Sequence, residues 1–405
     1  MSLAREIADA RPRVISALAV QLRDFDLVED AFADAAEKLI EGGDVPDRLT
    51  SWLFVVAKRK ALDAMRGRAA QDRALQKSAP VEEMADILTL PEPIADERLR
   101  LIFICCHPAI ALEARTALAL KVICGLPVGV IARLFVTSEA TMYQRITRAK
   151  AKVRDAGIAF ELPERKAWGE RLEAVLLTLE LAYTAAYQDA AGELDPELSG
   201  EVARLAAMVA ELLPEEPEAL GLAALVWLAR SREAARVDAD GAMVPLSQQD
   251  VCKWDFAAIE QARLWLEGAA KFGASGPYQV MAAIQLTHAR RAYDGKTDWG
   301  AVLALYDVLM GMRPAPMVGL NRAVALEKVE GAKAGLEALD AIEGSRIRSS
   351  RPYRVARAQM YSGLGQWDAA RCELEQALDQ DVPRAERLFL KRKLKELRQN
   401  HRPTS

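Results

Sequence analysis

Histidine and cysteine, the side chains that most often act as metal ligands and nucleophiles, are scarce in this sequence. The 405 residues include three histidines and five cysteines, and no Ser/His/Asp or paired-histidine arrangement stands out. General-base chemistry by histidine is therefore disfavoured, and five unevenly spread cysteines do not form a disulfide framework. We expect that the chain is not an enzyme and has no catalytic residue, metal site or cofactor.

Long apolar runs and aromatic side chains are also rare. No stretch approaches the roughly 18 uncharged apolar residues of a transmembrane helix, and the N-terminal segment lacks an apolar core of the signal-peptide type. We therefore expect a cytoplasmic protein that makes no contact with a membrane. With 6% aromatic residues and many Ala, Leu, Glu and Arg, the composition favours helix. The sequence predicts an all-α fold of two or three domains.

Charge is distributed unevenly along the chain, although the net charge of −4 disfavours a protein that simply coats nucleic acid. Residues 58–77 contain seven Lys or Arg against two Asp, and residues 139–154 contain five against one Glu. Between them, residues 78–97 contain six Asp or Glu, no cation and three prolines. This composition predicts an acidic linker over residues 71–95 between two small helical domains. Each basic run alone is also compatible with a solvated helix face.

The first predicted domain, residues 1–70, contains an acidic and a basic amphipathic helix. The helix over Leu27–Ile40 has an apolar face of Val28, Ala31, Phe32, Ala35 and Leu39. Its opposite face carries Glu29, Asp30, Asp34 and Glu37. In the next helix, Ser51–Arg68, the residues expected to face inwards are Leu53, Val56, Ala57 and Leu62. Its cations then project outwards, which suits a phosphate backbone; a surface helix of a plain bundle is the alternative.

The second predicted domain, residues 96–160, contains a helix-turn-helix pattern. A helix near Val128–Phe135 precedes a turn at Val136–Ser138, and the Ser138 hydroxyl is placed to accept the backbone N–H near Thr141. In the second helix, the expected buried stripe is Met142, Ile146, Ala149 and Val153. The outer face consists of residue types that reach bases and phosphates, namely Thr141, Gln144, Arg145, Arg148 and Lys152. A helical hairpin with a basic outer face is the alternative.

Together, the acidic helix, the Ser51-Trp-Leu…Ala57-Lys-Arg-Lys segment, the acidic linker and the helix-turn-helix resemble an extracytoplasmic-function (group IV) RNA polymerase sigma factor. The resemblance covers residues 1–160 and implies that the two domains are sigma regions 2 and 4. It implies that Glu29, Asp30, Asp34 and Glu37 contact core RNA polymerase at the β′ coiled coil, with the β flap as a further contact. It also assigns recognition of the promoter −10 element to Trp52, Lys58, Arg59, Lys60, Arg66 and Arg68. Recognition of the −35 element falls to Ser138, Thr141, Gln144, Arg145, Arg148 and Lys152.

The element Cys105-Cys106-His107-Pro108 suggests a metal or redox site at first sight. Adjacent cysteines do not easily bind one ion together in tetrahedral geometry, and a structural zinc site needs four ligands. Small buried cysteines near a helix end are the preferred interpretation. The same element resembles one found in the subgroup of these sigma factors that has a long C-terminal extension.

The remaining residues, 165–405, form such an extension and indicate successive helix pairs. Residues 358–378 follow the tetratricopeptide pattern, with small residues at Ala358, Ala370 and Ala377 and larger ones at Tyr361 and Leu374. Residues 321–342 read as a degenerate repeat with Ala325, Ala334 and Ala338. Such repeats form a concave surface that usually binds a partner, so we expect a regulatory domain that binds a protein or small ligand. Helices that merely pack together are the alternative.

Two segments interrupt the repeat pattern, Asp238–Trp254 and Gly276–Gln279. The first resembles a signature of the same subgroup, and we expect a structural loop that packs back on the first repeat, with a ligand or polymerase contact as the alternative.

The favoured function is a sigma factor that directs promoter-specific transcription initiation under control of its fused repeat domain. The alternative is a helix-turn-helix DNA-binding regulator with a protein-interaction scaffold that does not bind core polymerase.

Overall fold

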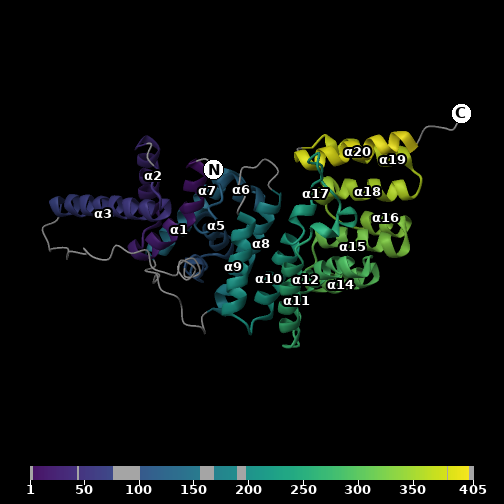
Figure 1. The fold of residues 1–405 in the computed structure, drawn as a ribbon, viewed down its shortest axis with the longest axis horizontal. Coiled ribbons are helices and arrows are strands. Elements are labelled where there is room, and N and C mark those ends of the chain that lie inside the picture. Colours follow the sequence, from purple (N-terminus) through teal and green to yellow (C-terminus); the bar gives the residue numbers. More distant parts are fainter. Residues whose placement is uncertain are drawn as a thin grey trace. The chain divides into compact units, whose positions relative to one another are not determined.

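The computed structural model describes residues 3–42, 45–75, 101–155, 168–188, 198–380 and 382–400. Over these ranges the protein is all-helical, as predicted, and its only β-type pairing is an isolated antiparallel bridge between Val237 and Met243 (Figure 1). None of the described helices combines the length and the apolar character needed to span a membrane. The chain divides into two compact units, residues 1–205 and 206–405. This division lies later in the chain than residue 165, where the C-terminal domain was expected to begin.

The first unit opens with three mutually packed helices, α1 (Leu3–Leu22), α2 (Phe25–Gly42) and α3 (Leu49–Leu75). The predicted apolar face of α2 is buried, which confirms its helical phase. The Asp24 carboxylate caps the N-terminus of this helix, because it accepts hydrogen bonds from the backbone N–H groups of Asp26 and Leu27, each at 3.1 Å. Because the apolar face is turned inwards, Asp30, Asp34 and Glu37 on the other side of α2 are displayed towards solvent.

Helix α3 differs from its predicted form in its inner face and its end. Leu53 and Ala57 are buried as expected, but Val56 and Leu62 are only half-buried. The expectation for those two was wrong because the inner face includes two other residues, Phe54 and Ala61. The helix also continues to Leu75, past the expected linker start at 71, since residues 69–75 are good helix formers without proline. The rest of the predicted linker, residues 76–95, lies outside the described residues.

The second part of this unit contains α5 (Leu112–Val122), α6 (Val128–Leu134), α7 (Glu139–Asp155) and α8 (Gly169–Gln188). Helices α6 and α7 form the predicted helix-turn-helix pair, and α8 packs on α5 and α6. The Phe103 and Trp168 rings are 5.0 Å apart, and Arg171 Nη1 donates to the Phe103 carbonyl at 2.8 Å. Helix α8 was expected to open the repeat domain, but these contacts make it part of the first unit.

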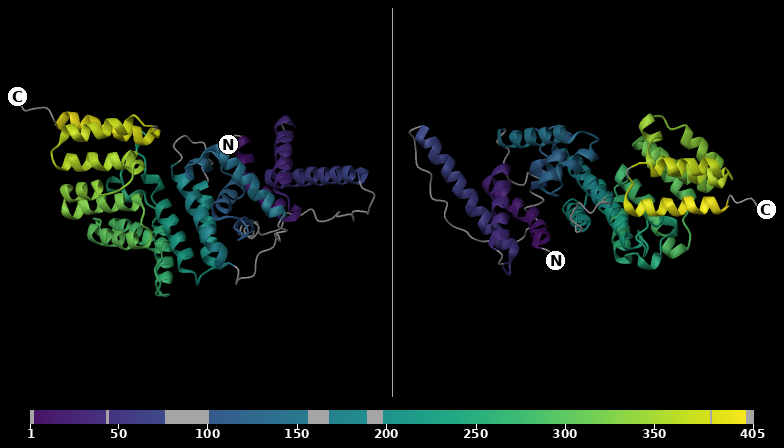
Figure 2. Two further views of the ribbon diagram at one scale, coloured as in Figure 1. Left: turned by 180° about the vertical axis from the view of Figure 1, so that it is seen from behind. Right: turned by 90° about the horizontal axis from the view of Figure 1, so that it is seen from above.

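The second unit is a series of helix pairs, seen from three directions in Figures 1 and 2. Helix α9 (Leu198–Leu212) crosses the division between the units. The helices that follow are α10 (Pro217–Arg230), α11 (Phe256–Ala270), α12 (Pro277–Ala289), α13 (Arg291–Asp294), α14 (Trp299–Met312), α15 (Pro316–Glu330), α16 (Ala332–Asp340), α17 (Ser345–Arg348), α18 (Arg351–Gly363), α19 (Trp367–Leu378) and α20 (Arg384–Asn400). The most extensive packing is between α10 and both α11 and α12, between α15 and α16, and between α18 and α19.

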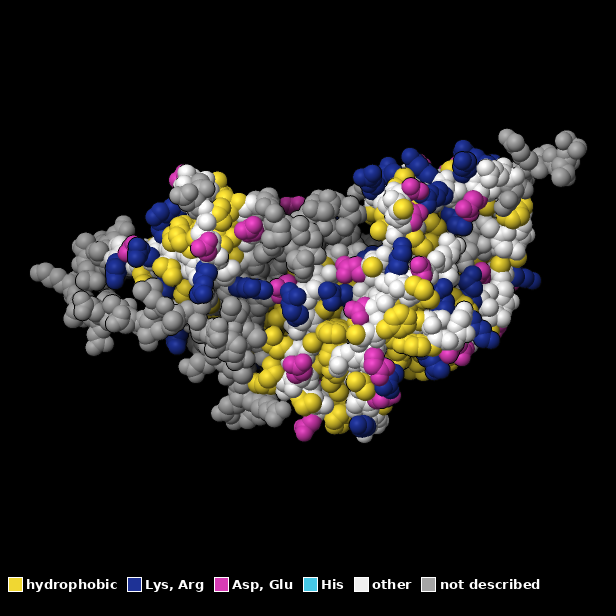
Figure 3. Space-filling model, in the orientation of Figure 1, with side chains coloured by type: hydrophobic (Ala, Val, Ile, Leu, Met, Phe, Trp, Pro, Cys, Tyr) yellow, Lys and Arg dark blue, Asp and Glu magenta, His cyan; other side chains and the backbone are white. Residues whose placement is uncertain are grey.

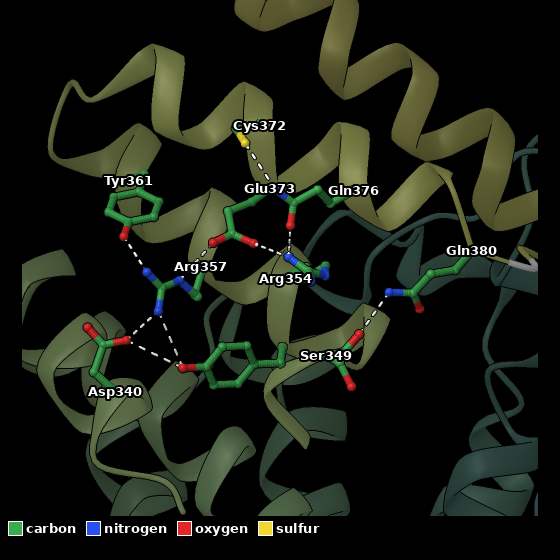
Figure 4. A network of polar contacts seen from close by, with 10 residues as sticks. Asp340, Ser349, Arg354, Arg357, Tyr361, Cys372, Glu373, Gln376 and Gln380 are labelled. Carbon is green, nitrogen blue, oxygen red and sulfur yellow. Dashed lines mark hydrogen bonds and ion pairs between the residues drawn. The ribbon is translucent and has the colours of Figure 1, made fainter. Parts of the chain in front are cut away.

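The predicted tetratricopeptide packing is present in the α18–α19 pair. All three of its alanines and Leu374 are buried, and Tyr361 packs at the edge of their cluster. Across these helices, Glu373 forms ion pairs with Arg357 at 2.9 Å and Arg354 at 3.2 Å, and Arg357 also pairs with Asp340 of α16 (Figure 4). Hydrophobic and ionic contacts therefore hold successive repeats together.

In the earlier repeat, formed by α15 and α16, the three alanines noted in the sequence differ in burial. Ala325 is buried, but Ala334 and Ala338 are only half-buried. Gly335 and Leu339 occupy the inner face instead. A Cβ atom at Gly335 would lie 2.7 Å from Glu327 Cβ, so glycine is what permits the close approach of α15 and α16.

Candidate nucleic-acid interface

The turn between α6 and α7 fixes where the exposed face of α7 begins. The backbone N–H of Thr141 donates to Ser138 Oγ at 3.2 Å, and the hydroxyls of these two residues are 2.8 Å apart. This confirms the predicted cap. Before it, Val136 has a φ of 51°, a left-handed conformation that is uncommon for a β-branched residue. The Val136 side chain is exposed, so this strained residue is not part of the buried core.

One face of α7 is buried and another presents polar side chains to solvent. The predicted stripe of Met142, Ile146, Ala149 and Val153 is buried, as expected. The exposed positions include four predicted contacts at helical spacing, Thr141, Gln144, Arg148 and Lys152. Ser138, at the start of the same helix, is exposed as well. These side chains offer hydroxyl, amide and cationic groups along one helix face, as recognition in a DNA groove requires.

Arg145 lies at the edge of the same face, but its guanidinium is already engaged by other helices of the group. Its side chain is 26% exposed, forms a 2.8 Å ion pair with Glu113 of α5 and lies 5.9 Å over the Phe135 ring. These contacts brace α7 against the rest of the helical group. Tyr143, which the sequence reasoning did not single out, is 65% exposed on α7. Two residues after Thr141, it lies on a different side of the helix from the polar face described above.

On α2, three of the four predicted acidic residues are displayed on the surface. Asp30, Asp34 and Glu37 are exposed and recur at helical spacing, so they share one side of the helix. The Asp34 carboxylate lies 3.5 Å from Lys60 Nζ of α3. Glu29 is different, because its side chain is only 19% exposed and is engaged by cations of other helices.

Glu29 belongs to an ionic cluster that joins α1, α2 and α7. Lys150 Nζ lies 2.6 Å from Glu29 Oε2 and 2.9 Å from Asp26 Oδ1, while Arg11 Nη2 lies 2.9 Å from Glu29 Oε1. Burial opposes the charge of Lys150, but the hydrogen bonds with Glu29 and Asp26 outweigh it and raise the pKa of this lysine. Burial and the neighbouring Arg11 lower the pKa of Lys121 on α5. Sequence reasoning missed this cluster, because nothing local pairs α2 with α7.

The basic face of α3 carries most of the residues assigned to the −10 element. Arg59, Lys60 and Arg66 are exposed, and Arg66 pairs with Asp63 at 3.4 Å. Trp52 and Lys58 are half-buried, with Lys58 Nζ 5.9 Å from the Phe54 ring centroid. The side chain of Arg68 lies outside the described part of the structure. The Lys60–Asp34 pair places the basic face of α3 beside the acidic face of α2.

The cysteine element is structural. Cys105 and Cys106 are fully buried, which confirms the preferred interpretation. Burial raises the pKa of both thiols, that of Cys106 to about 12, so they stay protonated and unreactive at neutral pH. Within the part of the chain that the structure describes, no cluster of three or more His, Cys, Asp or Glu side chains has the arrangement of a metal site.

The Asp238–Trp254 loop packs on the first helix pairs of the second unit, as expected. Trp254 is buried in the apolar cluster of α10 to α12, and Arg291 donates to the carbonyls of Ser247 and Gln249 at 3.0 and 2.7 Å. The loop also contacts α20, because Arg392 pairs with Asp238 and Asp240. The second predicted interruption, Gly276–Gln279, is the start of α12.

Two comparisons relate the chain to known sequences. Residues 171–270, from the start of α8 to the end of α11, match a model described as a family of unknown function (DUF6596). An uncharacterized protein of Rhizobium meliloti (strain 1021), R00370, is 35% identical over 405 residues. That alignment covers 96% of this chain and 95% of R00370, so the similarity extends over both compact units.

Proposed function

The chain belongs to the same family as R00370 of Rhizobium meliloti (strain 1021), and we propose that it is a sigma factor that directs bacterial RNA polymerase to promoters. In this proposal it binds core polymerase, recognises two promoter elements and helps to open the DNA. One observation carries the proposal. A single compact unit combines an exposed acidic face on α2, an exposed basic face on α3 and a capped helix-turn-helix.

The exposed face of α7 supports a DNA-reading role. Thr141 and Gln144 are suited to hydrogen bonds with base edges, while Arg148 and Lys152 can contact bases or phosphates. Arg145, which is paired with Glu113, would position α7 rather than reach DNA. On α3, the exposed cations Arg59 and Arg66 would contact the −10 element.

The acidic face of α2 supports binding to core polymerase through the β′ coiled coil. Asp30, Asp34 and Glu37 are exposed and would make the contact directly. Glu29 would act indirectly, because it is already bound by Arg11 and Lys150. The helix-turn-helix domain would contact the β flap, as the sigma resemblance implies.

The second unit would regulate this activity. Its stacked helix pairs provide an extended surface of the kind that binds a protein or small ligand. The DUF6596 match runs from α8 in the first unit to α11 in the second. The family segment therefore includes residues of both units.

The proposal is tested by co-elution of the full-length chain with bacterial core RNA polymerase in size-exclusion chromatography. The informative variant is Asp30→Lys combined with Glu37→Lys, which reverses two exposed charges of α2 and leaves the Asp34–Lys60 pair intact. The matched control combines Glu330→Lys with Glu343→Lys, two exposed carboxylates of the second unit. We expect co-elution of the wild type and the control, and its loss in the α2 variant.

Two outcomes would contradict this proposal. If the wild-type chain does not co-elute with core polymerase but binds duplex DNA tightly, it is a helix-turn-helix regulator of the other class. If the α2 variant co-elutes as well as the wild type, the acidic face of α2 is not the polymerase contact.

A further inference from the structure

The outer face of α20 carries a row of cations that the function proposed above does not use. Five exposed side chains recur at intervals of three or four residues, namely Arg384, Arg387, Lys391, Lys395 and Arg398. At about 100° per residue they fall within a sector of roughly 80°. Another side of α20 packs on α19 through buried leucines such as Leu390 and Leu397.

The carboxylates of α20 lie away from this basic face and are paired elsewhere. Glu386 forms a 2.8 Å ion pair with Arg351, and Glu396 forms a 2.9 Å pair with Lys393. Among the described residues, Lys391 and Lys395 form no ion pair with a carboxylate, and Arg398 makes only a long 3.6 Å contact with Glu375. Helix α11 is arranged differently, since its half-buried Arg263 is bracketed by carboxylates of the same helix. On α20, in contrast, the two carboxylates of the helix do not compensate the cations of the row.

The position of α20 leaves this face open. It is the last helix of the second unit and lies at the end of the stack in Figure 1 and in the left-hand view of Figure 2. In the space-filling view, Lys and Arg side chains gather over this end of the unit (Figure 3). Large apolar side chains that are exposed elsewhere in the unit, such as Leu264 and Met312, have no counterpart on described parts of α20.

We propose that the basic face of α20 binds the phosphate backbone of duplex DNA without reading its sequence. The row from Arg384 to Arg398 extends over about 21 Å, which is long enough to meet several phosphates. A face of cations without an aromatic or apolar anchor fits a polyanion better than a protein, whose binding sites centre on such anchors. The contact goes beyond the proposed function, because it does not depend on polymerase or on recognition by α7.

The test is the affinity of the full-length protein for a duplex of unrelated sequence, measured over a range of salt concentrations. The variants are Lys391→Glu with Lys395→Glu, and the milder Lys391→Gln with Lys395→Gln. The control, Lys271→Glu with Lys296→Glu, reverses two other exposed lysines of the same unit. For the Gln pair we expect about tenfold weaker DNA binding. We also expect the plot of log binding constant against log salt concentration to have a slope shallower by about 2, since each phosphate contact contributes about 0.9 to that slope. The Glu pair should bind more weakly still, and the control as the wild type.

Thermal unfolding of each variant separates a lost contact from a lost fold, since exposed substitutions should leave the midpoint unchanged. The proposal is overturned if both α20 variants bind DNA with the wild-type affinity and salt slope. It is also overturned if they keep DNA binding but lose retention of core polymerase, because the face would then contact a protein.

Discussion

At the scale of single residues, Gly221 and Glu218 explain how α12 is seated on α10. A Cβ atom at Gly221 would lie 2.7 Å from the backbone nitrogen of Gln279, so only glycine allows this approach. One turn earlier, the Glu218 carboxylate accepts the backbone N–H groups of Tyr278 and Gln279 at 2.9 and 3.1 Å. A carboxylate at a helix N-terminus is favourable because it meets unpaired N–H groups and the positive end of the helix dipole.

We predict that Gly221→Ala destabilises the protein by about 2 kcal/mol, because the clash involves backbone that no rotamer change relieves. Alanine would otherwise stabilise a helix by up to ~1 kcal/mol. Gly311→Ala in α14 is the control, since a Cβ there meets no atom within 4 Å. Urea unfolding gives the free energy of unfolding of both variants and of the wild type. A Gly221→Ala variant as stable as the wild type would refute the packing argument.

His288 predicts a pH dependence of stability. The side chain is 8% exposed and stacks edge-on against Trp299. Burial, followed by the charges of Arg232 and Arg291, lowers its pKa from 6.5 to about 4. Between pH 4 and pH 6.5, this histidine therefore binds a proton in the unfolded chain but not in the folded chain. This contribution to stability is therefore complete above pH 6.5 and is lost as the pH falls towards 4, by at most about 3 kcal/mol.

The measurement is the difference in unfolding free energy between pH 7.5 and pH 4.5 for the wild type and for His288→Gln. Carboxylate titration contributes to both proteins and cancels in the comparison. We expect a smaller loss on acidification in the variant. An equal loss in both would show that His288 does not titrate in this way.

At the scale of elements, the contacts of α7 distinguish Arg145, which braces the helix, from the exposed Arg148, which we propose contacts DNA. Arg148→Ala should weaken promoter binding by about 1–3 kcal/mol and leave stability nearly unchanged, because the side chain is exposed. Arg145→Ala should lower stability by roughly 1 kcal/mol, because it removes the pair with Glu113 and the contact with Phe135. Fluorescence anisotropy and thermal unfolding measure the two effects. A reversed pattern would mean that Arg145, not Arg148, contacts DNA.

The helices that the sequence predicted best are those with regular apolar spacing and a local cap. Helix α2 and helix α7 belong to this class, since their buried stripes and the Ser138 cap were all expected. The inner face of α3 was predicted less well, because Phe54 and Ala61 compete with Val56 and Leu62 for the interior. In α16 the short Gly335 permits a close approach that a count of alanines does not reveal.

Contacts between segments that lie far apart in the chain could not be predicted from the sequence. The pairing of Lys150 with Asp26 and Glu29 depends on how α7 lies against α2, which no local pattern specifies. Trp168 and Arg171 likewise attach α8 to the first unit through Phe103, although residue spacing suggested that a new domain begins near residue 165. Charge counts found the basic and acidic runs, but only the fold shows which charges are already paired.

At the scale of the whole molecule, one chain contains a unit that we propose reads promoters and a unit of helical repeats. The family relationship covers nearly the full length of both this chain and R00370, so the two units occur together in the relative as well. Exposed cations are concentrated on α3 and α7 in the first unit and on α20 in the second. Each unit therefore carries basic surface of its own despite a net charge of −4 for the chain.

The most direct test of the central claim is transcription in vitro by bacterial core RNA polymerase with the full-length chain as the only added factor. The template is a library of genomic fragments from the organism that encodes the chain, and the 5′ ends of the transcripts are mapped. The account predicts discrete start sites that share two upstream sequence elements and are absent with core polymerase alone. No start sites beyond those of core polymerase would contradict the sigma-factor assignment.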